Sequence, residues 1–271
     1  MKTPTTSDNN PPQWTSTSPR RGDAATTGST SKRVTVSEVW RYPVKSLRGE
    51  RLATAELTPD GIAGDRMVHV AGRRGPLTGR TRHGLLSVPA WTGPDGVPQV
   101  AGHPWDSDHA ARIIHDRAGP DAHLVADTTP ARFDVLGLLV ATDGAVARFG
   151  YDVRRLRPNL VLGGVDTDLE SQLPGSALAI GEALIGVHSV RDRCIVTTID
   201  PDTGQQDIEV LRSIRRTFKG QIALDCWVIR PGMIRVGEPV DIVPAPERPP
   251  RIGGWITGVP YPHASTATPL R

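Results

Sequence analysis

Two cysteines supply the only thiol side chains of the chain, and their sequence surroundings differ. Cys194 follows Arg193 and precedes the apolar run 195–199, so the pattern predicts that it lies where a strand begins. A neighbouring guanidinium favours the thiolate, which is the form that binds metals or attacks electrophiles. Cys226 lies inside the apolar run 222–229, as an ordinary buried residue would. The same packing role is the alternative for Cys194.

Three further segments combine basic side chains with hydroxyl or amide groups at predicted strand ends. These are Lys45 with Ser46 after Pro43, Arg66 after the glycine-containing loop 61–65, and Arg157 with Asn159 before the apolar run 160–162. An arginine fork suits phosphate or planar amide groups, and a lysine supplies a mobile point charge. For each segment taken singly, a solvated charge at the end of a loop is the alternative.

Familiar metal and nucleotide motifs do not occur in the sequence. The eight His residues are scattered, with no pair at i, i+4 and no Cys-x-x-Cys, which argues against a zinc site. There is also no Gly-rich phosphate loop. Two cysteines are too few for an iron–sulfur cluster or a disulfide framework, and they suit a reducing compartment. A thiol hydrolase with His188 as base stays open, although His188 also fits a structural strand residue.

The net charge of +3 does not indicate a nucleic-acid-binding protein, because all of it lies near the N-terminus. Residues 1–33 hold five basic and two acidic side chains, so the remainder of the chain is neutral. No stretch reaches the ~18 consecutive apolar residues of a membrane span, and the N-terminus does not resemble a secretion signal. We therefore expect a cytoplasmic protein without nucleic-acid or membrane partners.

Short β-branched runs separated by turn residues predict a mainly β fold, a barrel or sandwich rather than a parallel α/β sheet. The 28 Gly and 25 Pro residues agree with many turns. Only residues 207–218 show a convincing helical stripe, while 108–118 are a weaker helix candidate and Asp143-Gly144 predicts a turn. The strands are expected at 34–41, 51–57, 67–71, 135–141, 160–162, 177–180, 183–187, 222–229, 233–236 and 239–243.

Five segments, in this order along the chain, resemble the MOSC family, the molybdenum-cofactor sulfurase C-terminal domain proteins. Within that family the likeness is to the mitochondrial amidoxime-reducing component and its bacterial relatives. The segments are 42–46, 64–66, 157–159, 193–204 and 232–240, of which 193–204 is the most specific. Residues 67–69 and 89–132 depart from the family pattern.

The resemblance implies an N-terminal MOSC-type β-barrel domain at 34–125 and a MOSC β-barrel with one short helix at 126–243. Composition predicts a disordered Ser/Thr-rich tail at 1–33 and a Pro-rich C-terminal tail at 244–271. The implied cofactor is Mo-molybdopterin, with the Cys194 thiolate as its metal ligand. The residues implied to contact the pterin and its phosphate are Lys45, Ser46, Arg66, Arg157 and Asn159. Arg193 joins this cofactor-binding set, either by tuning Cys194 or by pairing with Asp192 or Asp200.

The implied function is that of a molybdenum-dependent oxidoreductase acting on N-hydroxylated or similar small molecules, with electrons supplied by a separate donor protein. A soft thiolate suits molybdenum that is already bound by dithiolene sulfurs. The alternative is a carrier of the cofactor or of sulfur, in which Cys194 would bear a persulfide. A cofactor-free interaction barrel is a third, weaker possibility.

Overall fold

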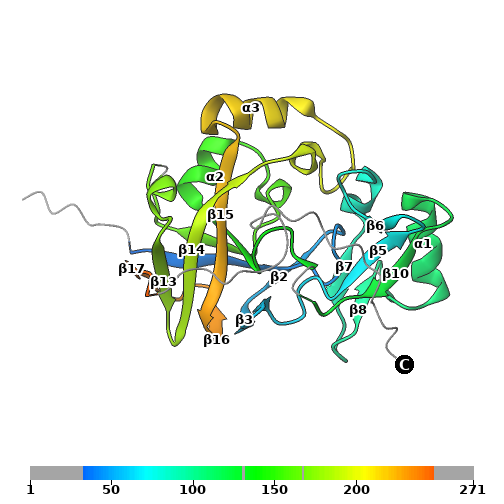
Figure 1. Ribbon diagram of the computed structural model, residues 1–271, viewed down its shortest axis with the longest axis horizontal. Coiled ribbons are helices and arrows are strands. Elements are labelled where there is room, and N and C mark those ends of the chain that lie inside the picture. Colours follow the sequence, from blue (N-terminus) through cyan, green and yellow to red (C-terminus); the bar gives the residue numbers. More distant parts are fainter. Residues whose placement is uncertain (1–32, 130–131, 167, 247–271) are drawn as a thin grey trace, which may run out of the picture. The chain divides into compact units, whose positions relative to one another are not determined.

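β-Strands are the commonest regular elements of the computed structural model, which describes residues 33–129, 132–166 and 168–246 (Figure 1). The predicted mainly β class is confirmed. The two predicted tails lie, apart from their inner ends, outside the described residues. Within the described ranges, none of the helices has the length and apolar character needed to cross a membrane. The domain boundary at 125/126 stays a prediction.

One eight-stranded sheet forms the frame of the fold. Its order is β17 (Asp241–Pro244), β13 (Ser176–Ile180), β14 (Ala183–Asp192), β15 (Gln221–Arg230), β11 (Leu138–Thr142), β12 (Leu160–Gly163), β1 (Thr35–Arg41) and β2 (Glu50–Leu52). Neighbouring strands are antiparallel except β11 and β12, which run parallel. The inward side chains of these strands build the largest apolar core, with Val140, Leu160, Ile185 and Leu224 among its fully buried members.

The segment 236–244 brings the two ends of this sheet together. Its first half bonds to β1, where the Gly237 amide donates to Val36 O at 2.7 Å and the Val36 amide donates to Glu238 O at 2.9 Å. Its second half is β17, which pairs with β13. The sheet therefore curls round in a barrel-like manner, because this short segment bonds to β1, next to the edge strand β2, and also pairs with β13 near the opposite edge.

Three small sheets complete the architecture. They are β10 (His123–Ala126) with β5 (Val68–Gly72) and β6 (Gly75–Leu77), then β16 (Gly232–Arg235) with β3 (Thr54–Thr58) and β4 (Gly61–Ile62), and β7 (Ala90–Thr92) with β8 (Pro98–Val100) and β9 (His103–Pro104). A second apolar core joins β5, β7 and β8 to helix α1 (Asp108–Ala118) and to the 3₁₀ helix η1 (His83–Ser87).

The expectation of a single short helix was wrong, because the described residues contain three α-helices. The predicted helix is confirmed as α3 (Ile208–Phe218), and the weaker candidate forms α1. Asp143-Gly144, expected to be a turn, instead begins α2 (Asp143–Phe149). The reason is local: the Thr142 hydroxyl accepts a bond from the Ala145 amide at 3.3 Å and caps the helix, and Asp143 lies in the first turn.

Candidate functional site

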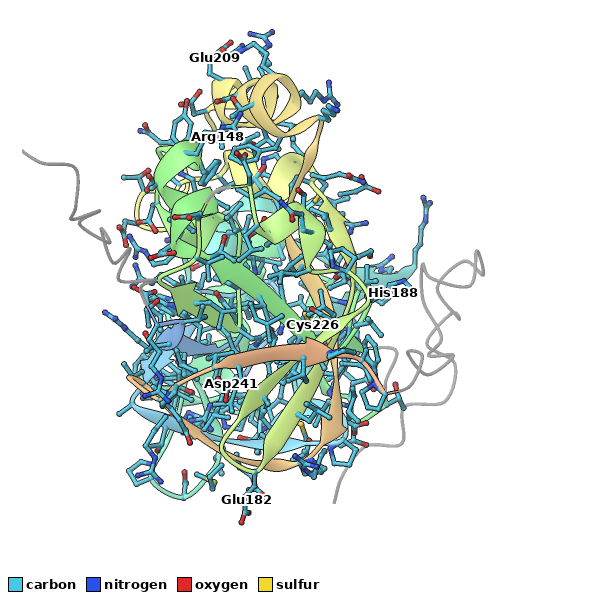
Figure 2. The ribbon with its side chains drawn as sticks, turned by 90° about the vertical axis from the view of Figure 1, so that its left-hand side faces the viewer. Arg148, Glu182, His188, Glu209, Cys226 and Asp241 are labelled. Carbon is cyan, nitrogen blue, oxygen red and sulfur yellow. The ribbon has the colours of Figure 1, made fainter. Side chains whose placement is uncertain are left out.

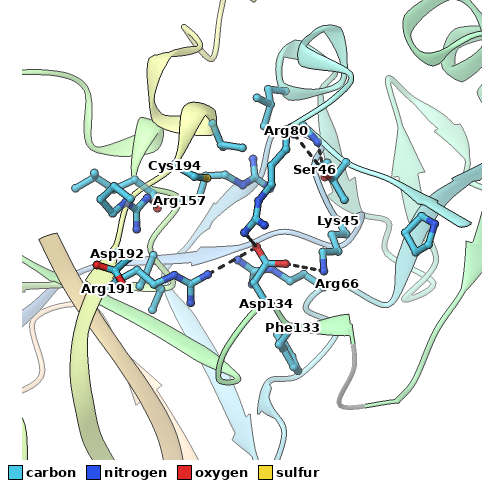
Figure 3. A pocket seen from close by; sticks show the side chains of 18 of the residues that line it. Lys45, Ser46, Arg66, Arg80, Phe133, Asp134, Arg157, Arg191, Asp192 and Cys194 are labelled. Carbon is cyan, nitrogen blue, oxygen red and sulfur yellow. Dashed lines mark hydrogen bonds and ion pairs between the residues drawn. The ribbon is translucent and has the colours of Figure 1, made fainter. Parts of the chain in front are cut away.

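A cavity of about 350 Å³ brings together every site residue predicted from the sequence (Figure 3). Lining it are Lys45, Ser46, Arg66, Arg157, Asn159, Arg193 and Cys194. These residues come from the loop after β1, the loop after β4, the end of the 3₁₀ helix η3 (Val153–Arg155) and the end of β14. The volume lies in the range of small-molecule pockets, about 300–1,000 Å³.

Cys194 lies half-buried just after the end of β14, and it does not begin a strand. The expected strand over 195–199 is wrong, because these residues form the 3₁₀ helix η5 (Ile195–Thr198) with Cys194 at its N-terminal end. The threonines explain the difference: the Thr197 hydroxyl donates to Cys194 O at 2.9 Å, and the Thr198 hydroxyl donates to Ile195 O at 2.6 Å. Such local bonds favour a tight turn over an extended strand.

Arg157 is held in a strained, enclosed position. Its φ is +58°, and its guanidinium carbon lies 4.3 Å from the centre of the Tyr42 ring. Its buried Nη2 has no hydrogen-bond partner among the described residues. Burial lowers the pKa of Arg157 to about 10 and raises the pKa of Tyr42 to about 12. A buried cation with an unused donor is costly unless a ligand supplies an acceptor.

Arg193, which also lines the cavity, repeats this pattern. Its Nη2 donates to Leu156 O at 2.7 Å, while its buried Nε has no partner in the described part of the chain. Burial, aided by the nearby charge of Arg191, lowers the pKa of Arg193 to about 10. Two arginines beside Cys194 therefore keep buried N–H groups that the described protein atoms do not satisfy.

Asn159 and Arg66 meet at the fully buried carboxylate of Asp65. The Asn159 amide donates to Asp65 Oδ2 at 3.0 Å and to Trp40 O at 3.3 Å, and its Oδ1 accepts from the Leu139 amide at 3.1 Å. Arg66 forms an ion pair with the same carboxylate. Because both amide hydrogens of Asn159 already have protein acceptors, its side chain mainly fixes the neighbouring strands and Asp65.

Lys45 and Ser46 belong to a sharp turn after β1. Ser46 has a φ of +72°, and its hydroxyl oxygen accepts a hydrogen bond from the Gly79 amide at 3.0 Å. The Lys45 ammonium lies 2.9 Å from the carboxylate of Asp134. The Ser46 hydroxyl accepts rather than donates in that bond, so its proton is available to an acceptor in the cavity.

Asp134 and Arg191 line the cavity but were missed by the sequence reasoning. The Asp134 carboxylate contacts Lys45 at 2.9 Å, Arg80 at 3.4 Å and Arg191 at 3.7 Å (Figure 3). Burial raises the pKa of Asp134, but the charges of Lys45, Arg191 and Arg80 outweigh it and hold the pKa well below the ordinary value. Arg191 also pairs with the buried Asp225. Neither Asp134 nor Arg191 stands in a recognisable motif, so no sequence signal pointed to them.

Cys226 provides the contrast that the sequence predicted. It lies inside β15 with no exposed surface, among the sheet strands (Figure 2). Burial raises the pKa of its thiol well above the usual value. Within the described ranges, no cluster of three or more His, Cys, Asp or Glu side chains is placed to hold a metal ion. Cys194 is therefore the cysteine that can act in the cavity.

Comparison with known proteins shows that two domain models of one family cover most of the predicted site residues in the cavity lining. The MOSC N-terminal beta barrel domain matches residues 33–96, which include Lys45, Ser46 and Arg66. The MOSC domain matches residues 142–241, which include Arg157 and Cys194.

Individual relatives are more distant. Mitochondrial amidoxime-reducing component 1 of Homo sapiens is 25% identical over 278 residues, covering 76% of this chain and 82% of that protein. The solved YUAD protein from Bacillus subtilis is 15% identical with a TM-score of 0.46, covering 78% of this chain and 96% of that chain. YiiM from Escherichia coli is 15% identical with a TM-score of 0.36, covering 78% of this chain and 72% of that chain. At these TM-scores, neither solved structure bears on the function of the cavity.

Proposed function

The chain belongs to the MOSC domain family, and from this premise we propose that its cavity binds the molybdenum cofactor and supports reduction of N-hydroxylated or similar small molecules. One observation carries the proposal. A half-buried thiol at Cys194 shares its cavity with the buried Nη2 of Arg157 and the buried Nε of Arg193, neither of which has a hydrogen-bond partner among the described residues. This pairing of a soft metal ligand with unsatisfied phosphate-binding donors suits a metal cofactor that carries a phosphate.

The residues present fit such a cofactor. Molybdopterin brings dithiolene sulfurs to the metal, so a single protein thiolate would complete a sulfur-rich coordination without a cluster of protein ligands. The phosphate would accept from guanidinium, ammonium and hydroxyl groups, and Arg157, Arg193, Lys45 and Ser46 offer these at one cavity. Binding an anion would also offset the cost of burying Arg157 and Arg193, whose pKa values burial lowers.

Each residue then has a distinct role. Cys194 would hold the metal, and the neighbouring Arg193 would offer its Nε hydrogen to the phosphate. Arg157 and Lys45 would orient the phosphate, while Asn159 would position the buried carboxylate to which Arg66 is bound. When bound, the cofactor would supply two-electron oxygen-atom transfer, which the protein side chains cannot perform themselves.

The substrate class comes from the relative and from the cavity walls. The human relative is named for amidoxime reduction, and at 25% identity we extend that chemistry to this chain only as a proposal. The apolar side chains of Leu86, Leu139 and Val196 line part of the cavity and would hold the carbon skeleton of a small substrate. We further propose that a separate redox protein supplies the electrons.

The test compares two cysteine variants after expression in a host that makes the molybdenum cofactor. Molybdenum and pterin are measured in the purified protein, and reduction of benzamidoxime is assayed with reduced methyl viologen as electron donor. We expect the wild type to contain both and to reduce benzamidoxime. Cys194→Ser should lose reduction while keeping much of its pterin, since the phosphate contacts remain.

Cys226→Ser is the matched control. It replaces the same atom at a fully buried position outside the cavity, so it should lower stability and leave molybdenum content unchanged. A wild type without molybdenum or pterin would refute the proposal. Bound cofactor with no reduction across a panel of N- and S-oxides would instead favour a carrier of the cofactor or of sulfur.

A further inference from the structure

One wall of the cavity comes from the β5–β6 hairpin and the loop that follows it. Two arginines of this wall line the cavity and are exposed: Arg74 in the hairpin turn and Arg80 in the loop, whose side chain is 39% exposed. Arg74 and Arg80 are therefore more exposed to solvent than Arg157 and Arg193, whose guanidinium groups contain buried atoms. The exposed pair therefore lies where the cavity meets solvent.

The two neighbouring arginines of the hairpin turn have different surroundings. Arg73 pairs with Asp121 at 2.8 Å, its side chain is 82% exposed, and it does not line the cavity. Arg74 lines the cavity, and no ion pair between described residues includes it. The positive charge of Arg74 is thus directed to the cavity without a carboxylate from the described chain to balance it.

Arg80 adds to this positive charge although it has an acidic neighbour. It lies 3.4 Å from Asp134, a carboxylate that also contacts Lys45 and Arg191. Seven basic side chains line the cavity: Lys45, Arg66, Arg74, Arg80, Arg157, Arg191 and Arg193. Four carboxylates partly balance this charge. Asp134 and Asp192 also line the cavity, while Asp65 pairs with Arg66 and Asp225 pairs with Arg191 without lining it. A phosphate of about −2 charge at the inner arginines would still leave the exposed wall positive.

We propose that Arg74 and Arg80 recognise an anionic group on the substrate, so that the protein prefers N-hydroxylated molecules that carry a carboxylate or a similar anion. This inference rests on the proposed function, because it concerns the substrate of the same cavity. The guanidinium fork suits a carboxylate, and the positive wall raises the local concentration of anions. The apolar lining residues Pro76, in β6 of the same wall, and Leu86, in the following 3₁₀ helix η1, would contact the body of such a molecule.

The expected effect is moderate because both side chains are exposed. Solvent-exposed ion pairs change an equilibrium by about twofold to fivefold each, and added salt weakens them. With two arginines, a carboxylated substrate should therefore be favoured by roughly fivefold to tenfold in kcat/KM at low salt, with most of the effect in KM.

The experiment uses the cofactor-loaded protein with benzamidoxime and 4-carboxybenzamidoxime, reduced methyl viologen as electron donor, and two salt concentrations. The measured quantity is the ratio of the two kcat/KM values. We expect a preference for the carboxylated molecule that shrinks in high salt and disappears in the Arg74→Gln/Arg80→Gln double variant. Arg73→Gln, the neighbouring arginine outside the cavity lining, should keep the wild-type ratio.

Failure of this inference is distinguishable from failure of the proposed function. Equal kcat/KM values for both molecules in the wild type, unchanged in the double variant, would overturn the inference while leaving the reductase proposal intact. If neither molecule is reduced, the proposed function is wrong, and calorimetric binding of the same two molecules decides the inference. If the carboxylated molecule then binds no more tightly than benzamidoxime, the inference is overturned. A preference for the carboxylated molecule that Arg73→Gln also abolishes would overturn it as well.

Discussion

Arg193 donates a hydrogen bond from its Nη2 to the carbonyl oxygen of Leu156 at 2.7 Å. This contact ties the residue before Cys194 to the residue before Arg157. Arg155 makes the reverse connection, with Nη1 donating to Thr198 O at 3.1 Å and Nη2 donating to Asp200 Oδ2 at 2.9 Å. Two arginines thus cross-link the turn that carries the candidate metal ligand and the turn that carries a candidate phosphate ligand.

Loss of the Arg155 connection should loosen the Cys194 turn. In Arg155→Gln, two charge-assisted bonds of a side chain that is 9% exposed are removed. We expect the free energy of unfolding to fall by about 2 kcal/mol. The Cys194 thiol should also react several-fold faster with a disulfide reagent, because η5 is held less firmly.

Arg148→Gln serves as the control for this change. It removes a half-exposed arginine whose ion-pair partner, Asp168, is 89% exposed and whose guanidinium lies 5.5 Å from the centre of the Phe218 ring, so stability should change by no more than about 1 kcal/mol. Urea unfolding and the rate of thiol modification provide the two readouts. An Arg155→Gln protein with wild-type stability and wild-type thiol reactivity would show that the cross-link does not hold Cys194.

Replacing Asp134 should produce a pH-dependent loss of stability. Because its folded-state pKa is depressed, ionised Asp134 stabilises the fold above its unfolded value of about 3.9, and this contribution is lost as the pH falls through the lower folded value. Asp134→Asn should therefore be less stable than the wild type at pH 7, by on the order of 2 kcal/mol. The difference should narrow below about pH 4.

Thermal unfolding of both proteins across this pH range is the measurement. Added phosphate should stabilise Asp134→Asn more than the wild type, since an anion can replace the missing carboxylate among Lys45, Arg80 and Arg191. A stability difference that stays constant from neutral to acidic pH would contradict the assignment of Asp134 as the counter-ion of these cations.

We expect Arg157 to lower the stability of the cofactor-free protein and to strengthen binding of the cofactor. Burial lowers its pKa to about 10, so at neutral pH the protein keeps a buried charge whose Nη2 has no hydrogen-bond partner within the described ranges. Arg157→Met, which preserves much of the side-chain length, should leave the cofactor-free protein as stable as the wild type or more stable by about 1 kcal/mol. The variant should nevertheless retain far less pterin after expression in a cofactor-replete host. Clear destabilisation of the cofactor-free variant would argue for a structural role.

Asp65 should be among the most sensitive positions of the site. Its fully buried carboxylate accepts from the Tyr42 amide at 2.7 Å and from Asn159, and it pairs with Arg66. Asp65→Ala leaves these groups without their partner, and we expect a loss of about 3–5 kcal/mol in the free energy of unfolding. Asp65→Asn should lose less, because its amide oxygen can still accept from Tyr42. Equal losses in denaturant unfolding would contradict the bonded arrangement.

The sequence allowed α3 to be predicted, but not α2, for reasons that are visible in the structure. Val210, Leu211 and Ile214 form a clear apolar stripe, and all three are buried. In α2, Gly144 stands where a turn dipeptide would be expected, and the segment is only seven residues long. The Thr142 cap is a local feature that outweighed the turn signal.

Only those residues of the candidate site that lie in segments with family resemblance could be predicted from the sequence. Cys194, Lys45 and Arg157 belong to segments with family resemblance, and the structure places them around one cavity. Asp134 could not be found this way, because its importance arises from Lys45, Arg80 and Arg191, which are brought to it by three distant segments. Likewise, the β-branched residues around Thr197 suggest a strand, while their hydroxyl bonds form a 3₁₀ turn.

The central claim is that Cys194 ligates molybdenum in this cavity. Molybdenum K-edge X-ray absorption of the purified wild type and of Cys194→Ser tests it most directly, because the spectrum reports the sulfur atoms bound to the metal. The wild type should show a thiolate sulfur in addition to the dithiolene pair, and Cys194→Ser should show one sulfur fewer with an oxygen in its place. An unchanged number of sulfur ligands in Cys194→Ser, or a wild type that contains no molybdenum, would contradict the account.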